Sequence, residues 1–190
     1  MIELPFTEDD VEKAKKRLAD ISKESAEKGG NFKKNTILKD GESFAGFLFE
    51  EAFLKYFPES RLVNQTSKSR NKFNYDIIFQ GKKCELKAVR RTVEPKPYYA
   101  CSVNKYTSKH QIPEKYVFSS IEYKGETPKT ITLVGWISRE DFYKKAKYLP
   151  KGTKDFNNIV KKDKYNVLIS QLDDIIINRK THDGIDWDSV

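Results

Sequence analysis

The sequence predicts an α/β fold in which a mixed central sheet is flanked by helices. Three observations support this class: two helical patterns come first, several β-rich segments follow, and a further helix and strand complete the order. With 190 residues, of which 37% are hydrophobic, the chain can bury a substantial core. No repeat or linker is apparent, so we expect one domain over 1–190, with its core at about 40–149 and the helix 7–28 and extension 150–190 packed on it.

The first helix is predicted over residues 7–28. Thr7 and Asp10 resemble a capping box, and Gly29 and Gly30 end the helix. Apolar residues at helical spacing form one stripe along it: Val11, Ala14, Leu18 and Ile21. The following segment, 31–40, is expected to be a loop.

The second helix, GESFAGFLFEEAFLKYF, is predicted over residues 41–57. Asp40 is its expected N-cap, and Pro58 follows its end. Apolar side chains cover much of its circumference, so this helix should pack against a sheet.

A β-hairpin is predicted within NYDIIFQGKKCELKAVRR, residues 74–91, where two apolar runs flank a Gln-Gly-Lys turn. The next segment, 92–102, contains two prolines and should be irregular or lie at a sheet edge. The remaining expected elements are strands at 115–123 and 130–137 joined by a turn-like linker, a helix at 139–149 capped by Ser138 with Asp141, and a strand at 165–170.

Composition favours a polyanionic partner. The net charge is +8 and the pI is about 9.2, and nucleic acid is the commonest partner of such a surface. Basic residues are concentrated in 82–115, which holds nine lysines and arginines against three acids. The alternative is an ordinary lysine-rich surface without a nucleic-acid partner.

Cysteine content and hydropathy give expectations about the cellular location of the protein. Only two cysteines occur, without C-x-x-C spacing, so a zinc site is not expected and a reduced, cytoplasmic location is the default. No apolar run approaches the roughly 20 residues of a membrane span. The N-terminus lacks a basic segment followed by an apolar one, so no secretory signal is predicted and no membrane partner is expected.

The predicted hairpin carries charges inside its apolar runs. Glu85 and Lys87 point to the same face of their strand, because side chains alternate. A two-residue turn at Gln80–Gly81 places Asp76 opposite Glu85, whereas a turn at Gly81–Lys82 places it opposite Lys87. Either register gathers the three charges on one face, but a three-residue loop would separate them.

Two carboxylates at cross-strand distance repel each other unless a cation lies between them. Lys87 can supply part of that charge, and Mg²⁺ would supply it more fully, since it is bound through one or two carboxylates plus phosphate oxygens and water. The alternative is a surface hairpin with ordinary salt bridges. The flanks YDII and CELKAV are too apolar for a solvated edge and favour a cleft instead.

Asp76, followed after eight residues by Glu85-Leu86-Lys87, resembles the motif of the PD-(D/E)XK nuclease superfamily. The preceding helix resembles that family's glycine-then-glutamate helix, with Gly46 and Glu50 at the matching positions. The segments 98–118 and 131–146 resemble small, phage-encoded members, so the resemblance covers about 40–149. Two departures from the family pattern are Tyr75 in place of the motif's proline, and Gln111 and Tyr116, which lack the spacing of the processive exonuclease branch.

The resemblance implies a three-layer α/β/α restriction-endonuclease-like core and Mg²⁺-dependent hydrolysis of DNA, with Mn²⁺ able to substitute. Asp76 and Glu85 would be metal ligands, the Leu86 carbonyl an extra ligand, and Lys87 the catalytic lysine. Glu50 would reach the metal directly or through water, with Glu42 and Glu51 as competitors for this role. A homodimer is also compatible, because relatives that cut both strands often dimerise.

Residues expected to contact nucleic acid follow the hairpin: Arg90, Arg91, Lys105, Lys109, His110 and Gln111. For the later four, a solvated basic loop is the alternative. Two other functions remain open at this point. One is a nucleic-acid-binding protein that keeps the nuclease fold without cutting, and the other is an interaction module whose basic surface binds a protein or a membrane.

Overall fold

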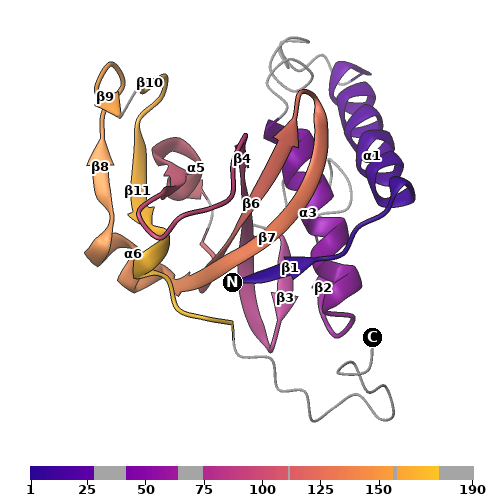
Figure 1. Ribbon diagram of the computed structural model, residues 1–190, viewed down its shortest axis with the longest axis horizontal. Coiled ribbons are helices and arrows are strands. Elements are labelled where there is room, and N and C mark those ends of the chain that lie inside the picture. The colour runs from indigo at the N-terminus through magenta and orange to yellow at the C-terminus, as the bar shows by residue number, and fades with distance from the viewer. Residues whose placement is uncertain (28–41, 64–74, 111, 156–157, 176–190) are drawn as a thin grey trace.

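The computed structural model describes residues 1–27, 42–63, 75–110, 112–155 and 158–175. Its main feature is a six-stranded sheet in the order β1-β7-β6-β4-β3-β2 (Figure 1). Strands β4 and β6 are parallel and the other neighbours are antiparallel, so the sheet is mixed as expected. The strands are β1 (Ile2–Leu4), β2 (Arg61–Leu62), β3 (Ile77–Phe79), β4 (Lys82–Arg91), β6 (Lys115–Lys124) and β7 (Thr127–Ser138).

Two helices cover one face of this sheet, as Figure 1 shows: α1 (Glu8–Glu27) and α3 (Glu42–Tyr56). Both expected helices are therefore confirmed within the residues that the structure describes. Phe49 and Phe53 of α3 are fully buried and share a core with Ile77, Cys84 and Leu86 of the hairpin. Burial of such large side chains contributes about 1.5–3 kcal/mol each, which fixes α3 against β4.

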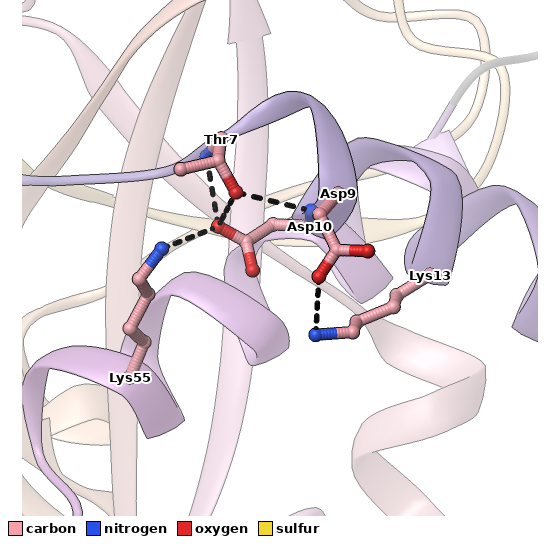
Figure 2. Close-up of polar contacts among 5 residues, drawn as sticks. All are labelled: Thr7, Asp9, Asp10, Lys13 and Lys55. Carbon is pink, nitrogen blue, oxygen red and sulfur yellow. Dashed lines mark hydrogen bonds and ion pairs between the residues drawn. The ribbon is translucent and has the colours of Figure 1, made fainter.

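The start of α1 is stabilised by a capping arrangement (Figure 2). The Asp10 Oδ2 atom accepts hydrogen bonds from the Thr7 backbone N–H at 2.7 Å and from the Thr7 hydroxyl at 2.9 Å. Lys55 of α3 also lies 2.9 Å from this oxygen. The expected capping box is thus present, and it joins the two helices. On the exposed side of α1, Asp9 and Lys13 form an ion pair at 2.6 Å.

A different layer covers the second face. It contains the three-stranded sheet β5-β11-β8 and the short helix α6, which lie on the other side of the main sheet in Figure 1. Tyr116 and Phe118 of β6 pack there against Phe142 of α6 in a second apolar cluster. The elements of this layer are β5 (Ala100–Asn104), α5 (Lys105–His110), α6 (Arg139–Lys145), β8 (Lys147–Leu149), β11 (Lys164–Leu168) and the 3-10 helix Ile169–Gln171. The α/β class is confirmed, with a small sheet contributing to the second outer layer.

Several boundaries differ from the sequence expectation. The helix expected over 139–149 ends at Lys145, because Ala146 is extended (φ −73°, ψ 136°) and the next residues form β8. The linker between β6 and β7 shortens to a tight turn, where Gly125 has a φ of 62°. Strand β1 and the small β9–β10 pair, Lys154–Asp155 with Asn158–Ile159, were not predicted. Asp40, Gly29–Gly30 and the segment 31–40 lie outside the described residues.

None of the helices in the described parts of the chain is long and apolar enough to cross a membrane.

Candidate active site

The hairpin of β3 and β4 sets the register of the site. Its turn consists of Gln80 and Gly81, whose φ angles are 50° and 72°. Two consecutive positive φ angles are the mark of a type I′ turn, which matches the twist of a two-residue hairpin. Ile77 pairs with Cys84 and Phe79 with Lys82. The first of the two expected registers is therefore the one adopted between Ile77 and Cys84. Beyond these pairs the Asp76 N–H donates a hydrogen bond of 3.0 Å to the Cys84 carbonyl, which places Asp76 next to the Cys84–Glu85 peptide bond.

The three charged residues of the motif lie together in a largely buried position. Asp76 is 7% exposed and Glu85 is 2% exposed. The Lys87 ammonium donates a hydrogen bond of 2.7 Å to Glu85 Oε1, and the Leu86 backbone N–H donates one of 2.9 Å to Asp76 Oδ2. The second bond holds the Asp76 carboxylate against β4, just beyond the last residue pair that links β3 to β4.

The electrostatics of the site are dominated by two acids that share one environment. The pKa of Glu85 is raised to about 8, chiefly by burial and to a smaller extent by the neighbouring Asp76 charge. Lys87 lowers the Glu85 pKa by its charge and its hydrogen bond, and Glu50 makes the smallest contribution, an increase. The lysine thus compensates the negative charge only in part, because a buried carboxylate pair disfavours full ionisation.

Glu50 lies on α3 and is 6% exposed, so it faces inward as expected. Its Oε2 atom is 2.6 Å from Nη1 of Arg17, a residue of α1. The same Arg17 nitrogen is 3.8 Å from Glu51 Oε1, and the guanidinium lies over the Phe47 ring at 4.6 Å. The side chain of Glu42, the other competitor, lies outside what the structure describes.

Arg17 is the residue at this site that the sequence reading missed. A signal for it existed: Asp10, Ala14, Arg17 and Ile21 are spaced by three or four residues and so share one helical face. A charged residue on a buried stripe needs a partner of opposite sign, and here each finds one on α3.

The donor set fits one divalent cation held by two carboxylates. Asp76 and Glu85 offer hard oxygen ligands, and the raised pKa of Glu85 shows that Lys87 alone does not offset the effects of burial and of the Asp76 charge. Across the described residues, no group of three or more His, Cys, Asp and Glu side chains is arranged to hold a metal. Glu50 thus forms no such trio with the two hairpin acids here.

The expected nucleic-acid contacts divide between two places. Arg90 and Arg91 end β4. Lys105 lies elsewhere, on α5, with its ammonium 3.1 Å from the Tyr148 hydroxyl and 3.6 Å from Asp163. Lys109 is exposed on the same helix, whereas the side chain of His110 and the whole of Gln111 lie outside the described residues.

Fold and site together define a mixed α/β protein with a buried cluster of two acids and a lysine. No family model, no curated protein and no solved structure matches the chain.

Proposed function

We propose that this protein is a Mg²⁺-dependent deoxyribonuclease that hydrolyses phosphodiester bonds on a three-layer restriction-endonuclease-like core. One observation carries the proposal. Asp76 and Glu85 are both buried and held at the same part of β4, where Asp76 accepts a hydrogen bond from the Leu86 N–H and Lys87 lies 2.7 Å from Glu85. Buried acids that sense each other's charge are costly, and such clusters are common at functional sites.

Each residue of the cluster has a distinct role in this proposal. The carboxylates of Asp76 and Glu85, with the Leu86 carbonyl, would hold the cation, and the Leu86 N–H keeps Asp76 in position. A bound Mg²⁺ polarises a phosphodiester and lowers the pKa of an attacking water. The Lys87 ammonium, anchored on Glu85, is placed to orient that water or to stabilise negative charge on the phosphate in the transition state.

Glu50 has a supporting role in the proposed site. It contributes to the electrostatic environment of Glu85, and it forms an ion pair of 2.6 Å with Arg17. We assign it contact with the cation through water, since Mg²⁺ keeps several waters in its shell. Arg17 would then hold the Glu50 carboxylate in place from the neighbouring helix.

A second candidate function is nucleic-acid binding without cleavage. It is favoured by one observation, that Glu50 does not join Asp76 and Glu85 in a three-acid group among the described side chains. The complete set of Asp, Glu and Lys favours the enzyme, because a protein that only binds has no need of a partly buried lysine beside two buried acids.

A cleavage assay separates the two candidates. Linear, circular and single-stranded DNA are incubated with the protein and Mg²⁺ or Mn²⁺. We expect cleavage that EDTA stops and that Asp76→Asn and Lys87→Ala reduce by at least about 100-fold. Lys82→Ala is the matched control, since Lys82 is an exposed lysine of the same strand. If the wild type and all variants bind DNA in a salt-dependent way and none of them cleaves it, the second candidate is favoured.

A further inference from the structure

A hollow of about 520 Å³ lies at the end of β4, outside the acid–lysine cluster. It is bordered by the last residues of that strand, by the segment leading to β5, and by the β6–β7 turn. Its main lining residues are Arg90, Arg91, Tyr99, Tyr123, Gly125 and Glu126. Its volume lies within the range of small-ligand pockets, about 300–1,000 Å³.

Aromatic rings hold both arginines of the hollow. The Arg90 guanidinium lies 4.1 Å from the centroid of Tyr123, and that of Arg91 lies 4.8 Å from the centroid of Tyr99. Arg91 also donates a hydrogen bond of 2.8 Å to the Ala100 carbonyl. Guanidinium groups stacked on rings keep their planar N–H edges available for a bidentate anion such as phosphate.

The charge balance of the hollow is positive. Within the described part of the chain, Arg91 has no carboxylate partner, and its Nε–H, which is buried, has no hydrogen-bond acceptor. Burial lowers the pKa of this guanidinium, so its charge is incompletely compensated. Arg90 is 3.3 Å from Glu126, whose side chain is 94% exposed. An ion pair that exposed is weak, so an incoming anion can replace Glu126 at low cost.

The hollow is aligned with the candidate active site along one strand. Side chains alternate on β4, so Arg91 projects to the same face as Glu85 and Lys87, as the pairing of Glu85 with Tyr116 and Lys87 with Phe118 indicates. At about 3.3 Å per residue, Arg91 lies about 13 Å from Lys87 and about 20 Å from Glu85. At 3.4 Å of rise per phosphate, this corresponds to about four to six nucleotides of one B-form strand.

Building on the proposed function, we infer that this hollow is a second substrate site, which binds a backbone phosphate of the strand to be cut. Arg90 and Arg91 leave β4 on opposite faces but both line the hollow at its end. The phosphate binds in this hollow, about four to six nucleotides from the scissile bond. Glu126 acts as an exposed counter-ion that the phosphate displaces. The site would make affinity depend on DNA length, because an oligonucleotide of three nucleotides cannot reach both places.

The test is equilibrium binding of fluorescent 3- and 16-nucleotide DNA to the full chain in EDTA, so that binding is measured without cleavage. Arg90→Gln should weaken binding of the longer DNA about three- to tenfold and reduce the slope of log K against log salt by about 0.7–0.9. Glu126→Gln should tighten it about twofold, because the competing acid is removed. Arg91→Lys retains the positive charge but loses the planar pair of N–H donors that can bind a phosphate bidentately. It should therefore weaken binding less than Arg91→Gln, which loses both.

Asp9 and Lys13 provide matched controls, because they form an exposed ion pair on α1 that does not line the hollow. Lys13→Gln and Asp9→Asn change the net charge by the same amounts as Arg90→Gln and Glu126→Gln. If each control shifts binding as much as its counterpart, or if the 3-nucleotide DNA responds equally, the second site is overturned while nuclease activity can stand. If the Arg90 and Glu126 effects appear in a protein that cuts nothing, the site stands and the nuclease proposal falls.

Discussion

Arg17 Nη1 lies 2.6 Å from Glu50 Oε2, which joins the buried faces of α1 and α3 directly behind the hairpin. Both side chains are largely shielded from water, at 12% and 8% exposure. A buried ion pair of this kind is costly to break from one side, because the remaining charge loses its partner without regaining water. Helix α1 thus affects the candidate site although it contributes no residue of the acid–lysine motif.

Removing one member of this pair should destabilise the protein. We expect Arg17→Leu to lower the free energy of unfolding by about 3 kcal/mol, measured by urea denaturation. The double variant Arg17→Leu/Glu50→Leu should recover much of that loss, because no isolated charge remains. Lys13→Leu, an exposed change on the same helix, is the control. Additive losses in the double variant would show that the two side chains are energetically independent.

Asp10 predicts an acid-dependent stability. Burial raises its pKa, but hydrogen bonds from Lys55 and Thr7 outweigh burial and leave the pKa below the usual 3.8. A carboxyl group whose pKa is lower in the folded than in the unfolded protein stabilises the fold at pH values above its unfolded-state pKa. This stabilisation is lost as the pH falls through the folded-state pKa. Asp10→Asn should therefore cost about 1–2 kcal/mol at pH 7 and much less near pH 3.

Asp9→Asn is the natural comparison for that experiment, since Asp9 is paired with Lys13, as Figure 2 shows, and both side chains are exposed. Its effect should stay within about 0.5 kcal/mol. A loss for Asp10→Asn that is the same at pH 3 and pH 7 would contradict the assignment of the ionised carboxylate as the cap.

Glu85 predicts the opposite pH dependence. Its folded pKa of about 8 lies above the ordinary value of 4.5. The folded protein therefore has its full stability below pH 4.5, where the Glu85 carboxyl is neutral in both the folded and the unfolded state. It loses stability as the pH rises toward 8, because the carboxyl ionises more readily in the unfolded state. In EDTA, Glu85→Gln should melt above the wild type at pH 8.5 by at least about 2–4 °C, a difference that disappears at pH 4. Mg²⁺ should raise the melting temperature of the wild type more at pH 8.5 than at pH 6, and leave Glu85→Gln unchanged.

The type I′ turn of the hairpin gives a test of register. Gln80 occupies a left-handed conformation that asparagine tolerates better. Gln80→Asn should therefore stabilise the protein by about 0.5 kcal/mol, whereas Gly81→Ala should cost about 1 kcal/mol. A Cβ at Gly81 would meet no atom within 4 Å, so that cost would come from the backbone alone. Chemical denaturation measures both, and a neutral Gly81→Ala would argue against this turn.

The hairpin and the two long helices could be predicted because their signals are local. The Gln-Gly turn allowed two registers that both bring Asp76, Glu85 and Lys87 to one face, and the stripe on residues 7–28 matched a helix. Arg17 could not be assigned a role, since its partner lies 33 positions away on another helix. Its place on the buried stripe was nevertheless visible.

The strand predicted over 165–170 is confirmed as β11, Lys164–Leu168, but the small sheet around it escaped prediction because long-range pairing defines it. Tyr148 and its neighbours continue a helical pattern from α6, but pairing of Lys147–Leu149 with β11 outweighs that local preference. Strand β1 is three residues long and exists through its pairs with β7, so no periodicity could reveal it. The hollow at Arg90 and Arg91 likewise depends on Tyr99 and Tyr123, which other elements supply.

The account depends most on a divalent cation between Asp76 and Glu85, and anomalous diffraction from crystals soaked with Mn²⁺ at pH 8.5 tests it directly. We predict one strong anomalous peak within about 2.0–2.6 Å of a carboxylate oxygen of each residue, absent from Asp76→Asn crystals prepared in the same way. A site without a peak, with the Lys87 ammonium still bound to Glu85, or a peak elsewhere on the chain, would contradict the proposed metal centre.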